Sequence, residues 1–247
     1  MRATVYGIPG SHPVKTGVLM LERKGIEYRL VQVPSVLCRP VLRAMGFPGP
    51  TVPAVKIDGR RLQTTRAIAR ALEELRPHPP LFPEDPAQRA AVEEAERWGD
   101  EVLQPIPRRI AYATLRRDRS GMASFFEGPM LGMPPRMAVA TAAPIVAMGS
   151  RINAADDAAL RADLGLLPKL LDHVDALLEE GTIGGEEPNA ADFQIAPSIR
   201  LMMLFDDTRP AIEGRPAAGH ATRTVPHYAG HVPPALPRNW LPAPHSP

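Results

Sequence analysis

Ser11 is the residue whose type and position best suit chemistry. It stands between a predicted strand at residues 3–8 and a helix that we expect to open near Pro13. A hydroxyl at a helix N-terminus lies beside unpaired backbone N–H groups and the positive end of the helix dipole, which favour an anion. The same position also suits a plain helix cap. The adjacent His12 is expected at the surface, because its side chain diverges from that of Ser11 along a helix.

The segments that must position Ser11 begin with a βαβ unit. Gly25 suits the C-cap of the first helix, and the segment YRLVQV at residues 28–33 predicts the second strand. Residues 34–50 are broken by prolines and glycines, so we expect a helix of only one or two turns there.

A hairpin and a third helix follow. Asp58-Gly59 is typical of a tight turn between two strands, AVKID and RRLQ, which we expect to pair antiparallel. The next helix has an apolar face that ends near Leu75, and either Thr64 or Thr65 can cap it. These segments predict the order β-α-β-α-β-β-α for an N-terminal domain at residues 1–77.

After a proline-rich linker at residues 78–85, every strong segment is helical, which predicts an all-α domain at residues 86–205. The expected helices cover residues 86–104, a region around 136–150, 155–180 and 190–205. Residues 206–247 are rich in proline, and we expect an extended strap without regular structure. That strap should be ordered where its larger apolar side chains dock, namely Tyr228, Leu236, Trp240 and Leu241.

The charge balance changes sign at the linker. Residues 1–80 hold 13 Lys and Arg against 5 Asp and Glu, a balance of +8, whereas residues 81–205 hold 12 against 19, a balance of −7. Two interpretations stay open: the domains complement each other electrostatically, or the basic half attracts a small anion.

The sequence argues against several classes of protein. The single cysteine, Cys38, excludes a disulfide framework, and the apolar stretch at residues 137–149 is too short to span a bilayer. The arginines are scattered, so we expect no nucleic-acid partner. The sequence has no zinc-type spacing or phosphate-binding glycine loop, and we expect no metal. A signal-peptide apolar region is also missing near Met1, so we expect a cytoplasmic location.

Several motifs together resemble the glutathione S-transferase superfamily, in which a thioredoxin-like domain precedes an all-α domain. Ser11 stands fourteen residues before the glycine of KGIEY, as a Ser or Cys does in that family. TVPAVKIDG resembles the family's Val-Pro before its third strand, and TTRAI resembles the start of its third helix. PNAADFQIAP resembles a helix-capping segment of the second domain, so the resemblance covers most of residues 1–205.

The resemblance implies an enzyme that activates the thiol of glutathione for attack on an apolar electrophile. Ser11 would donate a hydrogen bond to the thiolate. Val52 and Pro53 would be joined by a cis peptide bond, so that the Val52 backbone pairs with the backbone of glutathione. Thr65 would bind the γ-glutamyl carboxylate at a helix N-terminus. Thr64 replaces a Glu or Gln that binds the γ-glutamyl amine, and this weaker partner leaves another low-molecular-weight thiol open as the cosubstrate.

A second interpretation belongs to a different class of function. The same fold can serve as a binding or assembly module without turnover, which the departure at Thr64 and the unusual strap favour. The resemblance also implies a homodimer that takes a small-molecule thiol and an electrophile, without membrane association.

Overall fold

A mixed four-stranded sheet forms the first part of the chain, with the strand order β2-β1-β3-β4. The structure is a computed structural model that describes residues 1–126, 139 and 142–245. β1 runs parallel to β2, whereas β1 pairs antiparallel with β3, and β3 antiparallel with β4. The bounds are β1 (Arg2–Gly7), β2 (Glu27–Gln32), β3 (Ala54–Ile57) and β4 (Arg60–Gln63).

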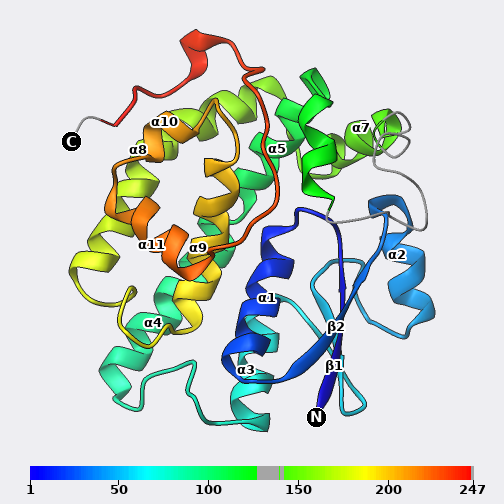
Figure 1. The fold of residues 1–247 in the computed structure, drawn as a ribbon, viewed down its shortest axis with the longest axis vertical. Coiled ribbons are helices and arrows are strands. Elements are labelled where there is room, and N and C mark those ends of the chain that lie inside the picture. Colours follow the sequence, from blue (N-terminus) through cyan, green and yellow to red (C-terminus); the bar gives the residue numbers. More distant parts are fainter. Residues whose placement is uncertain (127–138, 140–141, 246–247) are drawn as a thin grey trace.

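Three helices cover the two faces of this sheet. α1 (His12–Arg23) and α3 (Thr65–Leu75) lie on one face, and α2 (Ser35–Ala44) lies on the other (Figure 1). Side chains alternate along β1, so Val5 packs into the cluster that holds α1 and α3, while Tyr6 packs with α2. The thioredoxin-like order predicted from the sequence is confirmed.

The turns of the sheet use the residues that the sequence singled out. Asp58 and Gly59 both adopt positive φ, at 44° and 81°, as a tight hairpin between paired strands requires. Gly25 follows α1 with φ at 60°. These conformations are easiest for glycine and for short polar side chains, which is why the sequence marks them.

α2 is longer than predicted. The proline-rich composition led us to expect one or two turns, but the helix has 10 residues and contains Pro40. Cys38 and Leu42 lie four residues apart on one face and are buried with Tyr6 beneath the sheet. Burial of that face offsets the backbone hydrogen bond that Pro40 cannot donate, whereas sequence propensity considers only the proline.

The rest of the chain is mostly helical, as predicted. The predicted helix around residues 136–150 falls partly outside the described residues, and α7 begins at Ala143. Within the part of the chain that the structure describes, no helix is long and apolar enough to cross a membrane. The helical bounds are α4 (Pro86–Trp98), a π-helical turn (Gly99–Leu103), α5 (Pro105–Arg117), a 3-10 turn (Ser120–Phe125), α7 (Ala143–Ile152), α8 (Asp157–Glu179) and α9 (Ala190–Met203).

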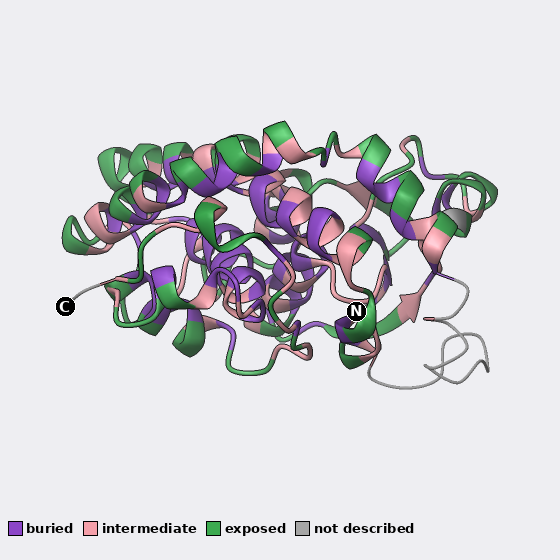
Figure 2. Cartoon of the chain, turned by 90° about the horizontal axis from the view of Figure 1, so that it is seen from above, coloured by how far each residue is buried: buried purple, intermediate pink, exposed green. Residues whose placement is uncertain are grey.

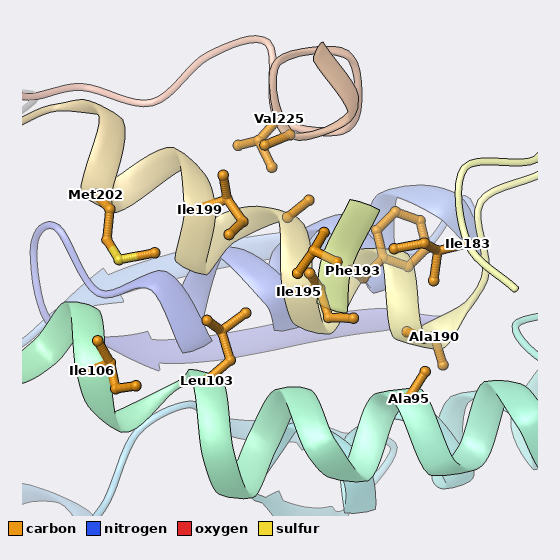
Figure 3. Packing of buried hydrophobic residues seen from close by; sticks show 14 of the residues in the cluster. Ala95, Leu103, Ile106, Ile183, Ala190, Phe193, Ile195, Ile199, Met202 and Val225 are labelled. Carbon is orange, nitrogen blue, oxygen red and sulfur yellow. The ribbon is translucent and has the colours of Figure 1, made fainter. Parts of the chain in front are cut away.

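α9 is the central helix of the core. Most residues of α9 are buried, and they lie on all sides of the helix. The outer helices, in contrast, expose one face (Figure 2). Figure 3 shows Ile195, Ile199 and Met202 of α9 between Leu103 and Ile106 below and Val225 above. The helix begins at a capping box in which Asn189 and Asp192 bind each other's backbone N–H groups.

The C-terminal region differs from the predicted strap. Residues 206–247 include α10 (Arg209–Ile212) and α11 (Pro216–Thr224), and α11 packs against α9. The prolines at positions 210 and 216 stand in the first turns of these helices, where a missing N–H costs little. After α11 the chain is extended apart from a 3-10 turn at Arg238–Trp240, and the apolar side chains expected to dock do pack on the core.

Candidate functional site

Ser11 ends the turn between β1 and α1 and is the N-cap residue of α1. Its backbone is extended, at φ −77° and ψ 112°, and its carbonyl accepts from the Lys15 N–H at 3.1 Å. The side chain, however, makes no capping hydrogen bond. Among the described residues, the hydroxyl therefore stands uncommitted at the positive end of the α1 dipole, where it can donate to an anion.

His12, the next residue, is buried, so the predicted surface position is wrong. Only 3% of His12 is exposed, and its Nε2 lies 3.1 Å from the carbonyl oxygen of Gln104. Burial, together with the charge of Arg108, lowers the pKa of His12 to about 3. The imidazole is therefore neutral and donates to Gln104, which fixes the start of α1 against α5 and leaves no free base beside Ser11. Sequence spacing could not reveal this contact between domains.

Val52 and Pro53 form the turn that leads into β3. The peptide bond between them is cis, and Pro53 is buried while Val52 is half-buried. Neither the N–H nor the carbonyl of Val52 has a hydrogen-bond partner among the described residues. These two groups can therefore pair with an extended peptide ligand.

Gln63 fixes the loop that leads to this turn, and the sequence did not indicate this role. Its side-chain amide accepts from the Gly49 N–H at 2.7 Å, and donates to the carbonyls of Gly49 at 2.9 Å and Thr51 at 3.0 Å. The residue is the last of β4, next to Ala54 of β3. A glutamine at the end of a strand has no special motif, so only the folded arrangement shows that it fixes the loop.

Thr64 and Thr65 play different parts at the start of α3. Thr64 has a positive φ of 69°, and its hydroxyl accepts from the Ala67 N–H at 3.3 Å, so it caps the helix. Thr65 is only 2% exposed, and its Oγ1 has no partner within the described residues. A buried hydroxyl without a partner is costly, so Thr65 is the better candidate for a ligand contact.

A hollow of about 130 Å³ lies beside Ser11. The turn before α1 forms one wall and the edge strand β2 another, and Phe125 and Tyr228 close it from the helical part. Phe125 packs against two glycines, because a Cβ added at Gly10 or Gly230 would approach its ring to 2.9 or 2.4 Å. Val52 and Thr65 do not line this hollow.

A second hollow, of about 270 Å³, lies between α2 and the loop that leads to Val52. Arg39 and Arg43 are both exposed and line it together with residues 47–50. Neither guanidinium forms an ion pair within the described part of the chain. Part of the positive charge of residues 1–80 is thus placed where an anionic ligand could bind.

One face of α5 lies against the N-terminal domain, beside His12. Gln104, Arg108 and Tyr112 are four residues apart, so they share this face. The Gln104 carbonyl binds His12, and its amide donates to Asp100 at 3.0 Å. Burial raises the pKa of Tyr112, and the charge of Arg108 and a hydrogen bond with Ser35 of α2 partly offset this.

Comparison with known proteins identifies the N-terminal domain of the chain and its fold. Residues 5–80 match the family model of the glutathione S-transferase N-terminal domain. The chain has a glutathione S-transferase N-terminal domain and the fold of that superfamily. The match contains each residue that the sequence analysis proposed for the site: Ser11, Val52, Pro53, Thr64 and Thr65.

Two curated relatives are similar to part of the chain. A probable maleylacetoacetate isomerase 1 of Drosophila melanogaster is 38% identical over 69 residues, which are 28% of this chain and 28% of that protein. Maleylacetoacetate isomerase of Rattus norvegicus is 38% identical over 92 residues, 36% of this chain and 43% of the relative. The chain thus matches less than half the length of these curated relatives.

Solved structures resemble the chain over most of its length. The beta-etherase LigF of Sphingobium has a TM-score of 0.61 at 17% identity, with 90% of this chain and 99% of that chain covered. A glutathione S-transferase from Rhodospirillum rubrum has a TM-score of 0.58 at 18% identity, with 90% and 85% covered. At such identities the likeness shows the glutathione S-transferase fold alone.

Proposed function

We propose that this protein is a glutathione-dependent enzyme in which Ser11 stabilises the thiolate of bound glutathione for attack on an electrophile. The observation that carries the proposal is the Ser11 hydroxyl, which makes no capping bond at the N-terminus of α1. A free thiol has a pKa of about 8.5, and each unit by which it is lowered corresponds to about 1.4 kcal/mol of preference for the thiolate. One hydroxyl donor and the helix dipole together suit that task.

The remaining contacts of the proposed thiol site come from the N-terminal domain. Val52 offers to the glutathione backbone an N–H and a carbonyl that have no partner in the described part of the chain, and Thr65 offers its buried hydroxyl to the γ-glutamyl carboxylate. Thr64 offers a weaker contact to the thiol ligand, because its hydroxyl already accepts a hydrogen bond from the Ala67 N–H. A related low-molecular-weight thiol therefore stays within the proposal as an alternative cosubstrate.

The decisive test compares wild type with Ser11→Ala. We expect the ultraviolet absorbance of the bound thiolate to titrate at higher pH in the variant, and kcat with a model electrophile to fall at neutral pH. Ser120→Ala is the matched control, since Ser120 is exposed and its hydroxyl donates to Asp118. Equal thiolate titrations and equal rates in wild type and Ser11→Ala would remove Ser11 from the chemistry.

A second candidate reaction is favoured by the names of the curated relatives, which are maleylacetoacetate isomerases. In an isomerisation, the thiolate adds to one carbon of an activated double bond, the resulting single bond rotates, and the thiolate leaves again. Glutathione is regenerated and the product has the mass of the substrate. Mass spectrometry separates the two reactions, because conjugation gives an adduct and isomerisation does not.

The same fold without turnover is the alternative from another class. Calorimetric titration with glutathione distinguishes it, because an absence of heat up to millimolar concentration would contradict the enzyme as proposed. The proposal also includes a homodimer, as the superfamily suggests. Light scattering after size-exclusion chromatography measures that mass directly.

A further inference from the structure

Arg108 lies on the face of α5 that turns toward the N-terminal domain. One turn before it, the carbonyl of Gln104 binds His12, the residue next to Ser11. One turn after it, Tyr112 bonds to Ser35 at the start of α2. Arg108 is therefore held between two contacts that join the domains, on the side of α5 nearest the start of α1.

The arginine next to it shows what a structural role looks like on this helix. Arg109 points the other way and binds Asp163 of α8 with both ends of its fork, at 2.5 and 2.6 Å. Arg117, farther along, binds Asp157 at 2.7 Å. These ion pairs tie α5 to the rest of the helical domain.

Arg108 has no such partner. In the described residues, no carboxylate forms an ion pair with it and no acceptor lies within hydrogen-bond distance of its nitrogens. The side chain is half-buried, and loss of solvent lowers its pKa. Tyr112 and, to a smaller extent, Asp100 oppose that shift in pKa, but neither accepts a hydrogen bond from Arg108, and the Asp100 carboxylate accepts from Gln104.

A half-buried cation without a counter-ion is unfavourable, and a bound anion would relieve it. Arg108 lies close enough to His12, in the first turn of α1, for its charge to lower the pKa of that histidine. The positive end of the α1 dipole therefore adds positive potential on the same side as Arg108. The nitrogens of Arg108 are not among the fully buried polar atoms without a hydrogen-bond partner, so a ligand can reach them. Arginine binds a carboxylate through two parallel hydrogen bonds, which fixes orientation as well as charge.

We propose that Arg108 binds an anionic group, a carboxylate above all, on the electrophilic substrate. This inference rests on the proposed function and narrows its substrate class from an apolar electrophile to an apolar body with a negative charge. The assignment to the electrophile follows from position, because Arg108 belongs to the helical domain, whereas the thiol contacts proposed above, Val52 and Thr65, belong to the N-terminal domain.

Binding is measured first with a pair of unreactive probes, 3,5-dinitrobenzoate and its methyl ester, by calorimetry. We expect wild type to prefer the carboxylate, and Arg108→Met to bind it at least about tenfold more weakly while its affinity for the ester is unchanged. Arg108→Lys, which keeps the charge, should recover part of the preference. Arg116→Met is the matched control, because Arg116 is exposed on another part of α5 and pairs with Asp157.

Turnover is measured next with 4-chloro-3,5-dinitrobenzoate and its methyl ester, which share one leaving group. The ratio of their kcat/KM values should fall at least about tenfold in Arg108→Met, because only the acid loses a charge-assisted contact. An unchanged ratio would overturn the inference, and so would an equal loss of both rates. A parallel loss of glutathione affinity would overturn it as well, because it would assign Arg108 to the thiol.

The two proposals fail in different ways. If wild type converts neither chlorinated probe but still prefers the unreactive carboxylate through Arg108, the enzyme proposal falls and the anion site stands. If wild type converts both probes without discrimination, the enzyme proposal stands and the anion site falls. Thermal unfolding of each variant confirms that it is folded before either result is interpreted.

Discussion

The hydroxyl of Tyr228 donates a hydrogen bond of 3.0 Å to the carbonyl oxygen of Gly10, 218 residues earlier in the sequence. Gly10 immediately precedes Ser11, so the C-terminal segment is fastened to the turn that carries the proposed thiolate donor. A parallel bridge between Phe205 and Val232 holds the same segment to the end of α9. The position of Ser11 therefore depends on the segment around Tyr228 as well as on the N-terminal domain.

Tyr228→Phe tests this fastening. The variant keeps the ring but leaves the Gly10 carbonyl without its donor, so we expect a loss of about 1 kcal/mol in the free energy of unfolding. Hydrogen exchange should rise in residues 228–232 and at Ser11. Thr222→Val is the control, because the Thr222 hydroxyl donates within α11, to the carbonyl of Ala218. If exchange at Ser11 does not respond to the loss of the Tyr228 hydroxyl, the hydrogen bond does not hold the turn.

The pair Lys24 and Glu73 predicts a much larger effect on stability. The Lys24 side chain is fully buried, and its ammonium binds Glu73 at 2.5 Å and the carbonyls of Pro77 and Pro79 at 3.2 and 2.7 Å. Lys24→Met leaves these oxygens without this donor, so we expect a loss of roughly 3 kcal/mol in the free energy of unfolding.

The exposed pair Arg60 and Glu74 offers the control for Lys24. Their side chains are 52% and 70% exposed, so Arg60→Met should cost less than about 1 kcal/mol. Denaturant unfolding of both variants gives the comparison. Equal costs would mean that the Lys24 ion pair contributes no more than a surface pair.

The fold was predictable wherever local chemistry determines it. Asp58 and Gly59 specify a turn that few other residues allow, and Gly25 ends α1 for the same reason. α2 and the C-terminal helices were not predictable from their proline-rich sequences, because propensity rules do not include the burial of an apolar face.

The candidate site was predictable only in its N-terminal part. Ser11 and Thr65 stand at helix starts that the sequence shows, and the family match contains both. Three features arise when the helical domain packs on the sheet domain: the burial of His12, the hydrogen bond from Tyr228 to Gly10, and the lack of an ion-pair partner for Arg108 among the described residues. Residues far apart in sequence create these contacts, and no local pattern encodes them.

The pKa of His12 predicts how stability depends on pH. Burial lowers it from 6.5 to about 3 in the folded protein, so the folded state favours the neutral ring. The stability that neutral His12 contributes is therefore complete above pH 6.5 and is lost as the pH falls toward 3. At pH 4.5 we expect wild type to have lost about 2–3 kcal/mol that His12→Gln does not lose.

Chemical denaturation at pH 7 and 4.5 measures this difference for His12→Gln against wild type. His227→Gln is the matched control, because His227 is exposed. The buried His220, whose pKa is lowered to about 4 by burial, contributes to the acid loss of all three proteins alike. A pH dependence in His12→Gln identical to that of wild type would contradict a neutral, buried His12.

Thr65→Val separates binding from stability. The Thr65 hydroxyl is buried and has no partner among the residues that the structure describes, so replacing it with a methyl group of similar size should leave the free energy of unfolding unchanged or slightly higher. If the hydroxyl serves the thiol, glutathione affinity should fall by about tenfold in calorimetry. Thr64→Val should show the reverse pattern, because it removes the cap on Ala67 and costs about 1 kcal/mol of stability. A loss of stability in Thr65→Val with unchanged affinity would show that the hydroxyl belongs to the fold and not to the ligand.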